Sequence, residues 1–313
     1  MNFNGAKIAC FGDSLTQHGI WIEEAAEQLC RKLPGAKTEL YNCGIGGASL
    51  SSAMWKIGED VMSCFPDYVL ISFGANDIGC GLYDRGGTAE EKQERITKYE
   101  ESLKTCTDYF AKRGVGVIIS APPPFDFFDG GVHIEEKLDA LKKIGLAARK
   151  VAKTADTAFI DLYDDMSCAV RAFAKTGTHL FRDDGIHPNE LGYRILGRIV
   201  LSRLGFPVSV PMNAAEAAEE FGEFSEANKR RFELEQKLRL AFWIKYTVDM
   251  RSQTYKLAGF DREHTAERLL ARLEDGETSQ WIKDGIKTYL AFGGELGGLR
   301  ERLAAETRKM YSE

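Results

Sequence analysis

The first 205 residues alternate short apolar runs with longer amphipathic runs, and this alternation constrains the fold more than any other feature of the sequence. Each short run is largely apolar, which is typical of a strand buried on both faces of a parallel sheet. In the longer runs the apolar residues recur at helical spacing. Strands that alternate with helices in this way form a parallel sheet with helices on both sides. We therefore predict an α/β domain with three layers, α/β/α.

The alternation also predicts where these elements lie. Strands are expected at residues 7–11, 38–42, 68–73, 115–120 and 158–162. Helices are expected at residues 21–32, 51–64, 89–112, 134–153 and 162–175. A further helix is expected to begin after Pro188, because proline is well suited to the first helical position.

The sequence changes in character after residue 206. The stretch "GFPVSVPMN", with Pro207 and Pro211, predicts an extended connector, and no strand is expected beyond it. Helical spacing then predicts a C-terminal all-α appendage from the apolar residues Leu234, Leu238, Phe242, Tyr246, Leu269, Leu273, Trp281, Ile282, Ile286, Tyr289 and Leu290. We divide the chain into domains at 1–206 and 207–313, and expect the helical extension to serve packing, homo-oligomerisation or a lid.

Composition excludes several classes of partner. The net charge of -6 and the lack of a basic cluster argue against nucleic acid or an anionic membrane surface. No apolar run reaches the ~20 residues that span a bilayer, and the start lacks a signal peptide, so we expect a cytoplasmic protein. The seven cysteines have no CxxC or Cys/His spacing, which predicts reduced thiols and no metal site. A small-molecule substrate fits these features, and we expect no cofactor.

Polar residues and glycines follow three of the expected strands, where an open α/β sheet binds its ligands. Ser14 follows the first strand, the glycine-rich stretch 42–47 follows the second, and Asn76 follows the third. Near the end of the domain, Asp184 lies three residues before His187. Taken singly, these residues are ordinary helix caps, turn formers and loop residues. Stretch 42–47 does not match GxGxxG and no GK[ST] follows it, which argues against nucleotide binding.

Together these residues supply every group that acyl transfer through a serine requires. The reaction needs a hydroxyl nucleophile, an imidazole base, a carboxylate that orients the imidazole, and fixed donors for the developing oxyanion. A serine, a histidine, an aspartate, an asparagine amide and backbone N–H groups of a glycine-rich turn are all expected at the same sheet edge. The sequence therefore favours a serine hydrolase.

The same motifs, in this order, resemble the SGNH hydrolases, also called GDSL esterases and lipases. The resemblance covers about the first 205 residues, through Gly-Asp-Ser-Leu at 12–15, a turn glycine at 47, Gly-Ala-Asn-Asp at 74–77 and Asp-Gly-Ile-His-Pro at 184–188. It implies a flavodoxin-like parallel sheet. It also implies that Ser14 is the nucleophile, His187 the base and Asp184 the residue that orients His187.

The resemblance further implies the composition of the oxyanion hole. Its donors would be the backbone N–H groups of Ser14 and Gly47 and the side-chain amide of Asn76. Gly44 and Gly46 share the turn with Gly47, and only the family pattern favours Gly47 among them.

Four further residues near these motifs have less defined expected roles. Asp183 is a rival to Asp184, and the family spacing favours Asp184. We expect Asp13 and Asp77 to shape their loops. His18 lies close enough to Ser14 in sequence to touch substrate.

The function that follows is a serine esterase acting on a carboxylic ester of a small alcohol. A short acyl group such as acetyl on a sugar is the expected substrate. A lysophospholipase-like or thioesterase-like acyl hydrolase is an alternative. A further alternative is a non-catalytic binding module whose helical tail docks a partner.

Overall fold

The computed structural model describes residues 3–33, 35–128, 131–256, 271–276, 278–291 and 296–311. The chain divides into two compact units, Met1–Asn228 and Lys229–Glu313. The connector and the following residues up to 228 thus belong to the first unit by their contacts. The two units are described separately below.

The first unit is built on a parallel five-stranded sheet with the strand order β2-β1-β3-β4-β5. This is the order of flavodoxin-like sheets. All five predicted strands are confirmed, with ends that differ by at most two residues: β1 Lys7–Gly12, β2 Glu39–Gly44, β3 Tyr68–Ser72, β4 Gly116–Ala121 and β5 Ala158–Asp161.

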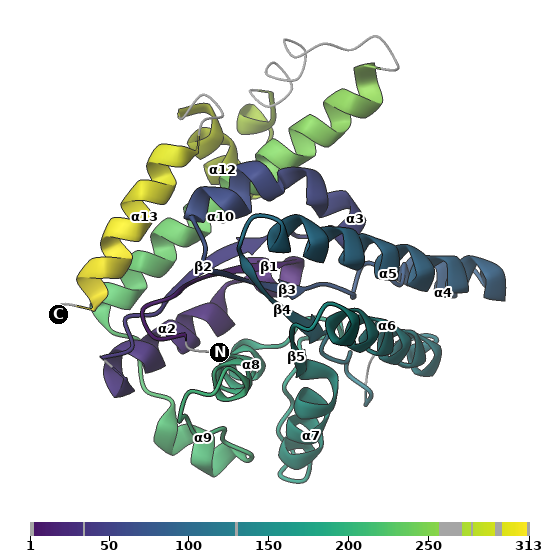
Figure 1. The fold of residues 1–313 in the computed structure, drawn as a ribbon, viewed down its shortest axis with the longest axis horizontal. Coiled ribbons are helices and arrows are strands. Elements are labelled where there is room, and N and C mark those ends of the chain that lie inside the picture. Colours follow the sequence, from purple (N-terminus) through teal and green to yellow (C-terminus); the bar gives the residue numbers. More distant parts are fainter. Residues whose placement is uncertain are drawn as a thin grey trace. The chain divides into compact units, whose positions relative to one another are not determined.

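Helices cover both faces of the sheet, which confirms the three-layer α/β/α prediction (Figure 1). The chain moves from β1 to β2 in one direction and from β3 to β5 in the other, so right-handed crossovers place the helices on opposite faces. One face carries α3 Leu50–Ala53, α5 Ala89–Ala111 and α6 Ile134–Thr154, and the other carries α2 Ile20–Lys32, α7 Leu162–Ala174 and α8 Glu190–Arg203.

The predicted helix at 51–64 is irregular. After α3 the chain continues through a 3₁₀ turn at Met54–Lys56, a π turn at Ile57–Val61 and a second 3₁₀ turn at Met62–Cys64. The helix propensity of this segment is low because it contains Ser51, Ser52 and Gly58. Local packing therefore determines the hydrogen-bond pattern here.

The predicted helix after Pro188 is confirmed, but Pro188 does not occupy its first helical position. Helix α8 begins at Glu190, and Asn189 caps it by accepting a hydrogen bond from the Gly192 N–H at 2.9 Å. An asparagine side chain can satisfy a free N–H of the first turn, which proline cannot do. Pro188 instead forms an isolated antiparallel bridge with Phe181.

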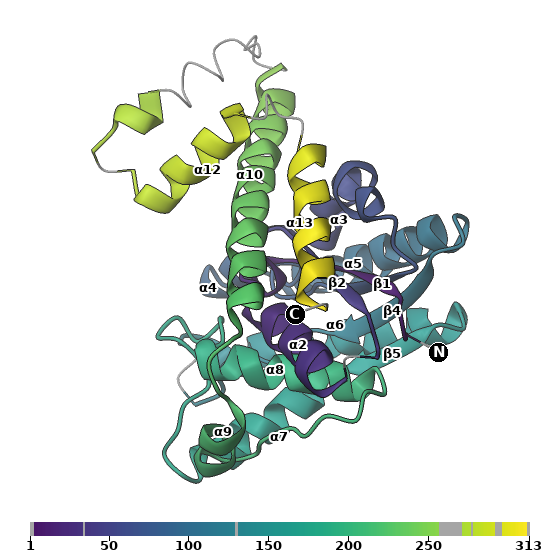
Figure 2. The ribbon, with the colours of Figure 1, turned by 90° about the vertical axis from the view of Figure 1, so that its left-hand side faces the viewer.

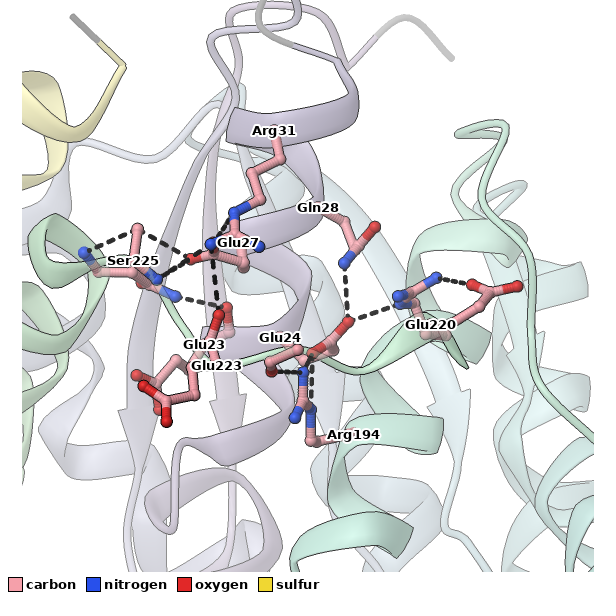
Figure 3. A network of polar contacts seen from close by, with 12 residues as sticks. Glu23, Glu24, Glu27, Gln28, Arg31, Arg194, Glu220, Glu223 and Ser225 are labelled. Carbon is pink, nitrogen blue, oxygen red and sulfur yellow. Dashed lines mark hydrogen bonds and ion pairs between the residues drawn. The ribbon is translucent and has the colours of Figure 1, made fainter. Parts of the chain in front are cut away.

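A buried network of charged side chains connects α2, α8 and the segment that follows them (Figure 3). Glu24 of α2 is fully buried and accepts hydrogen bonds from Arg194 at 2.8 Å and Arg198 at 2.6 Å. Arg198 also contacts Glu220 at 2.9 Å, in the short helix α9 Ala214–Glu220. Through these ion pairs, the segment after the connector is attached to the α/β domain.

All regular elements in the described residues of the second unit are helices, which agrees with the predicted appendage. Its elements are α10 Glu226–Lys256, which begins just before the unit, α12 Gln280–Ala291 and α13 Gly297–Met310, a helix that was not predicted. Helix α12 lies beside α10 (Figure 2). Ile244 of α10 packs with Ile286 of α12, and Leu273, Ile282 and Leu290 surround them. Leu269 lies outside the described residues. Across the described ranges, every helix is too short or too polar to cross a membrane.

Candidate active site

Three adjacent strands bring the predicted site residues to one edge of the sheet. In the sheet register, Gly12 of β1 lies opposite Gly44 of β2 on one side and Ser72 of β3 on the other. Ser14, Gly47 and Asn76 follow these three strands at their carboxyl ends. The strand order alone therefore places the predicted nucleophile between the two predicted oxyanion loops.

The turn that carries Ser14 is fixed by the residues beside it. A Cβ on Gly12 would lie 2.2 Å from Thr16 Oγ1 and 2.7 Å from the Ser72 carbonyl oxygen, so only glycine fits there. Asp13 accepts a hydrogen bond from the Leu15 N–H at 3.0 Å and caps the short helix α1 Ser14–Gln17. Ser14 is consequently held at the first position of a helix, half-buried at the sheet edge.

Ser14, His187 and Asp184 form a continuous chain of hydrogen bonds. His187 Nε2 lies 2.9 Å from Ser14 Oγ, and His187 Nδ1 lies 2.7 Å from Asp184 Oδ2. The other carboxylate oxygen, Asp184 Oδ1, accepts hydrogen bonds from the N–H groups of Ile186 at 2.9 Å and His187 at 2.8 Å. Asp184, and not its neighbour Asp183, is thus the carboxylate at the His187 ring.

The local environment favours an ionised Asp184. Partial burial acts to raise the pKa of this carboxyl, but the hydrogen bonds from the His187 and Ile186 N–H groups and from the His187 ring lower it below its usual value. An ionised carboxylate at Nδ1 holds the imidazole in the tautomer that leaves Nε2 free to accept the serine proton.

His18 contacts the same imidazole. Its ring lies edge-to-face against the His187 ring, with centroids 5.2 Å apart. Burial, followed by the positive charges of Arg182 and His187, lowers the pKa of His18 to about 4. His18 is therefore a neutral ring that packs against His187, and it is not among the residues that line the cleft described below.

Hydrogen bonding distinguishes the three glycines of the turn after β2. The Gly44 N–H donates to Asn42 Oδ1 at 2.9 Å, and the Gly46 N–H donates to Gln17 Oε1. Gly47 has a left-handed φ of 75°, and within the described residues its N–H has no acceptor. Of the three N–H groups, that of Gly47 is the one available to a ligand.

Asn76 points its amide toward the same turn. Its Nδ2 donates to the Ala48 carbonyl oxygen at 3.1 Å, which orients the side chain beside Gly47. The amide has a second N–H that can donate to a ligand. Ser14, Gly47 and Asn76 all line one cleft.

Two buried carboxyl groups support these loops. Asp77 accepts a hydrogen bond from the Leu50 N–H at 3.0 Å, which connects the third loop to α3. Burial is the main reason that the pKa values of Asp13 and Asp77 are both raised to about 7. These contacts agree with the loop-shaping roles expected for the two residues.

The cleft has a volume of about 540 Å³ and contains residues that the sequence reasoning missed. Besides Ser14, Gly47, Asn76 and His187, its walls include Cys80, Phe125, Arg85 and Arg95. Cys80 belongs to the short helix α4 Cys80–Asp84, and Arg95 to α5. These residues carry no motif, so the sequence offered no signal that would have separated them from ordinary helix positions.

Solved structures share this fold. A gut microbial diltiazem-metabolizing enzyme aligns with a TM-score of 0.76 at 16% identity, over 99% of this chain and 95% of that chain. The acetyl xylan esterase AlAXEase aligns with a TM-score of 0.53 at 25% identity, over 63% of this chain and 98% of that one.

Sequence comparison agrees with the geometry. An acetylxylan esterase of Geobacillus stearothermophilus is 22% identical over 218 residues, which cover 65% of this chain and 95% of that protein. The sequence profile of the GDSL-like lipase/acylhydrolase family matches residues 10–195, and this match includes all the predicted site residues. Because that match spans more than half of the chain, the protein belongs to the GDSL-like lipase/acylhydrolase family and is a carboxylic ester hydrolase.

Proposed function

We propose that this esterase removes a short acyl group, most simply acetyl, from the hydroxyl group of a sugar or a similar small alcohol. The observation that carries the chemistry is the hydrogen-bonded chain from Ser14 Oγ through His187 to Asp184, at 2.9 and 2.7 Å. The choice of acetyl is supported by the similarity to acetylxylan esterases.

In the proposed reaction, Ser14 Oγ attacks the ester carbonyl while its proton passes to His187 Nε2. The carbon–oxygen bond to the alcohol then breaks, and the alcohol leaves with the proton from His187. A water molecule, deprotonated by the same nitrogen, then attacks the acyl carbon on Ser14. The bond between that carbon and Ser14 Oγ breaks, Oγ takes the proton back from His187, and the carboxylic acid leaves. Asp184 stays ionised throughout and stabilises the imidazolium ion.

The negative charge on the carbonyl oxygen would be stabilised by the N–H groups of Ser14 and Gly47 and by the Asn76 amide. Both backbone N–H groups lack a protein acceptor within the described residues, which supports this assignment. Fixed donors of this kind stabilise the transition state strongly because they need no reorganisation during the reaction.

The first test compares Ser14→Ala with Ser202→Ala, a control at an exposed position of α8. We expect Ser14→Ala to lose about 10³-fold or more of kcat on 4-nitrophenyl acetate and to lose labelling by a fluorophosphonate. Circular dichroism checks that both variants keep the fold. Parental activity in Ser14→Ala would refute the proposed nucleophile.

The second test measures kcat/KM on 4-nitrophenyl acetate, butyrate and octanoate. We expect the acetate to be the best substrate. A strong preference for the octanoate would contradict the short acyl group and would favour the lysophospholipase-like or thioesterase-like alternative.

A further inference from the structure

Two cationic side chains line the cleft beside Ser14, although the chain carries a net charge of -6. Its lining includes the guanidinium groups of Arg85 and Arg95 but no aspartate or glutamate. Unlike charges attract most strongly where no competing carboxylate is present. A ligand with a negative charge would therefore be favoured in this cleft.

The two arginines differ in what they already bind. Arg85 forms an ion pair with Glu91 at 3.1 Å. The guanidinium group of Arg95 forms no hydrogen bond or ion pair with any described residue. Its guanidinium group lies against Gly79, where an added Cβ would lie 3.4 Å from Arg95 Nε. Arg95 is thus the cleft residue whose donors remain available to a ligand.

A structural role for Arg95 has less support. The buried Asp77 is a candidate partner, since the charge of Arg95 acts to lower the pKa of this carboxyl. Burial outweighs that effect, however, and no ion pair forms between the two side chains. Arg95 therefore does not neutralise a buried carboxylate through direct contact.

We propose that Arg95 binds an anionic group on the substrate, so that this esterase acts on acyl esters of acidic alcohols such as sugar acids. The inference rests on the proposed function, because a short acyl group such as acetyl has no room for a charge. The anion must then belong to the alcohol portion. A guanidinium group suits this role, since its parallel N–H groups match the two oxygens of a carboxylate.

The test uses two acetyl esters of the same size, the anion 4-acetoxybenzoate and the neutral 4-acetoxybenzamide. The readout is the ratio of their kcat/KM values, measured for the parent, Arg95→Gln, Arg95→Lys and Lys98→Gln. Lys98 is the matched control, because it is an exposed cation on α5 that does not line the cleft.

We expect Arg95→Gln to lower the ratio about tenfold, mainly through a higher KM for the anionic ester. Arg95→Lys should keep part of the preference, because it keeps the charge. Lys98→Gln should leave the ratio unchanged, and added salt should reduce the ratio in the parent.

If Arg95→Gln leaves the ratio unchanged, including the case where kcat/KM falls equally on both esters, Arg95 does not recognise an anion. The esterase activity would remain established by that result. A parent that hydrolyses neither ester and resists fluorophosphonate labelling would overturn the proposed function and this inference together.

Discussion

Glu24 is the residue whose replacement is expected to destabilise the first unit most clearly. Its carboxylate is completely buried and accepts hydrogen bonds from Arg194, Arg198 and Gln28 at 2.8, 2.6 and 2.9 Å (Figure 3). Glu24→Gln keeps the size of the side chain but removes its charge. Arg198, itself completely buried, then keeps Glu220 as its carboxylate partner.

The magnitude follows from the burial of both partners. Removing one member of a buried ion pair costs about 3–5 kcal/mol where the remaining charge is left without a partner. Because Arg198 keeps Glu220, we expect a loss at the lower end of that range, about 3 kcal/mol. The matched control is Glu100→Gln, which breaks an exposed pair with Lys150 whose side chains are 33% and 69% exposed. Exposed pairs contribute at most about 1 kcal/mol, so this variant should resemble the parent.

Urea unfolding measures the difference. Fluorophosphonate labelling of Ser14 reports on the first unit specifically, and the fluorescence of the buried Trp21 in α2 provides a second probe. With a urea m-value of about 3 kcal/mol/M, the midpoint of Glu24→Gln should fall by about 1 M or more. If Glu24→Gln and Glu100→Gln unfold at the same urea concentration, the buried network does not stabilise the fold as argued.

Two further predictions concern the oxyanion loop. Asn76→Ala should lower kcat on 4-nitrophenyl acetate about 10²- to 10³-fold without changing the circular dichroism spectrum, and a loss below tenfold would exclude the amide as an oxyanion donor. Asp13 and Asp77, whose pKa values are raised from 3.8 to about 7, bind protons in the folded state that the unfolded chain has released. The contribution of these two carboxyl groups to the free energy of unfolding is therefore fully present below pH 4, and it is lost as pH rises to 7. Asp77→Asn keeps an acceptor for the Leu50 N–H, so its urea midpoint should fall less than that of the parent between pH 5 and pH 8. Equal falls in both proteins would contradict the raised pKa values.

The sheet was predictable because its strands are apolar and alternate along the chain with amphipathic helical segments. The contact between Asp184 and His187 was likewise predictable, because both residues lie in one local turn. The attachment of residues 207–228 was not, because it depends on charged side chains such as Glu24 and Arg198. In a sequence, charges on a helix indicate a solvent-facing surface, and nothing distinguishes those that are buried in pairs.

Arg95 is a second example of the same limit. Arg95 occupies one of several charged positions on α5, and the sequence pattern does not distinguish it from Lys98. In the structure Arg95 lies against Gly79 and lines the cleft, whereas Lys98 does not line it. The three glycines after β2 were equally ambiguous, because the side chains of Asn42 and Gln17 determine which N–H remains available.

The turn that carries Asp184 and His187 has a consequence for how activity could be controlled. Both residues are held by hydrogen bonds inside four consecutive positions. Among the hydrogen bonds of the described residues, a single one joins this turn to Ser14, which lies 173 positions before His187. A displacement of this turn would therefore carry acid and base together and leave their mutual alignment intact. If Ser14 is the nucleophile, as proposed, its activation depends on the separation between His187 Nε2 and Ser14 Oγ. A small rigid shift of this loop would then switch the enzyme off without unfolding any part of it.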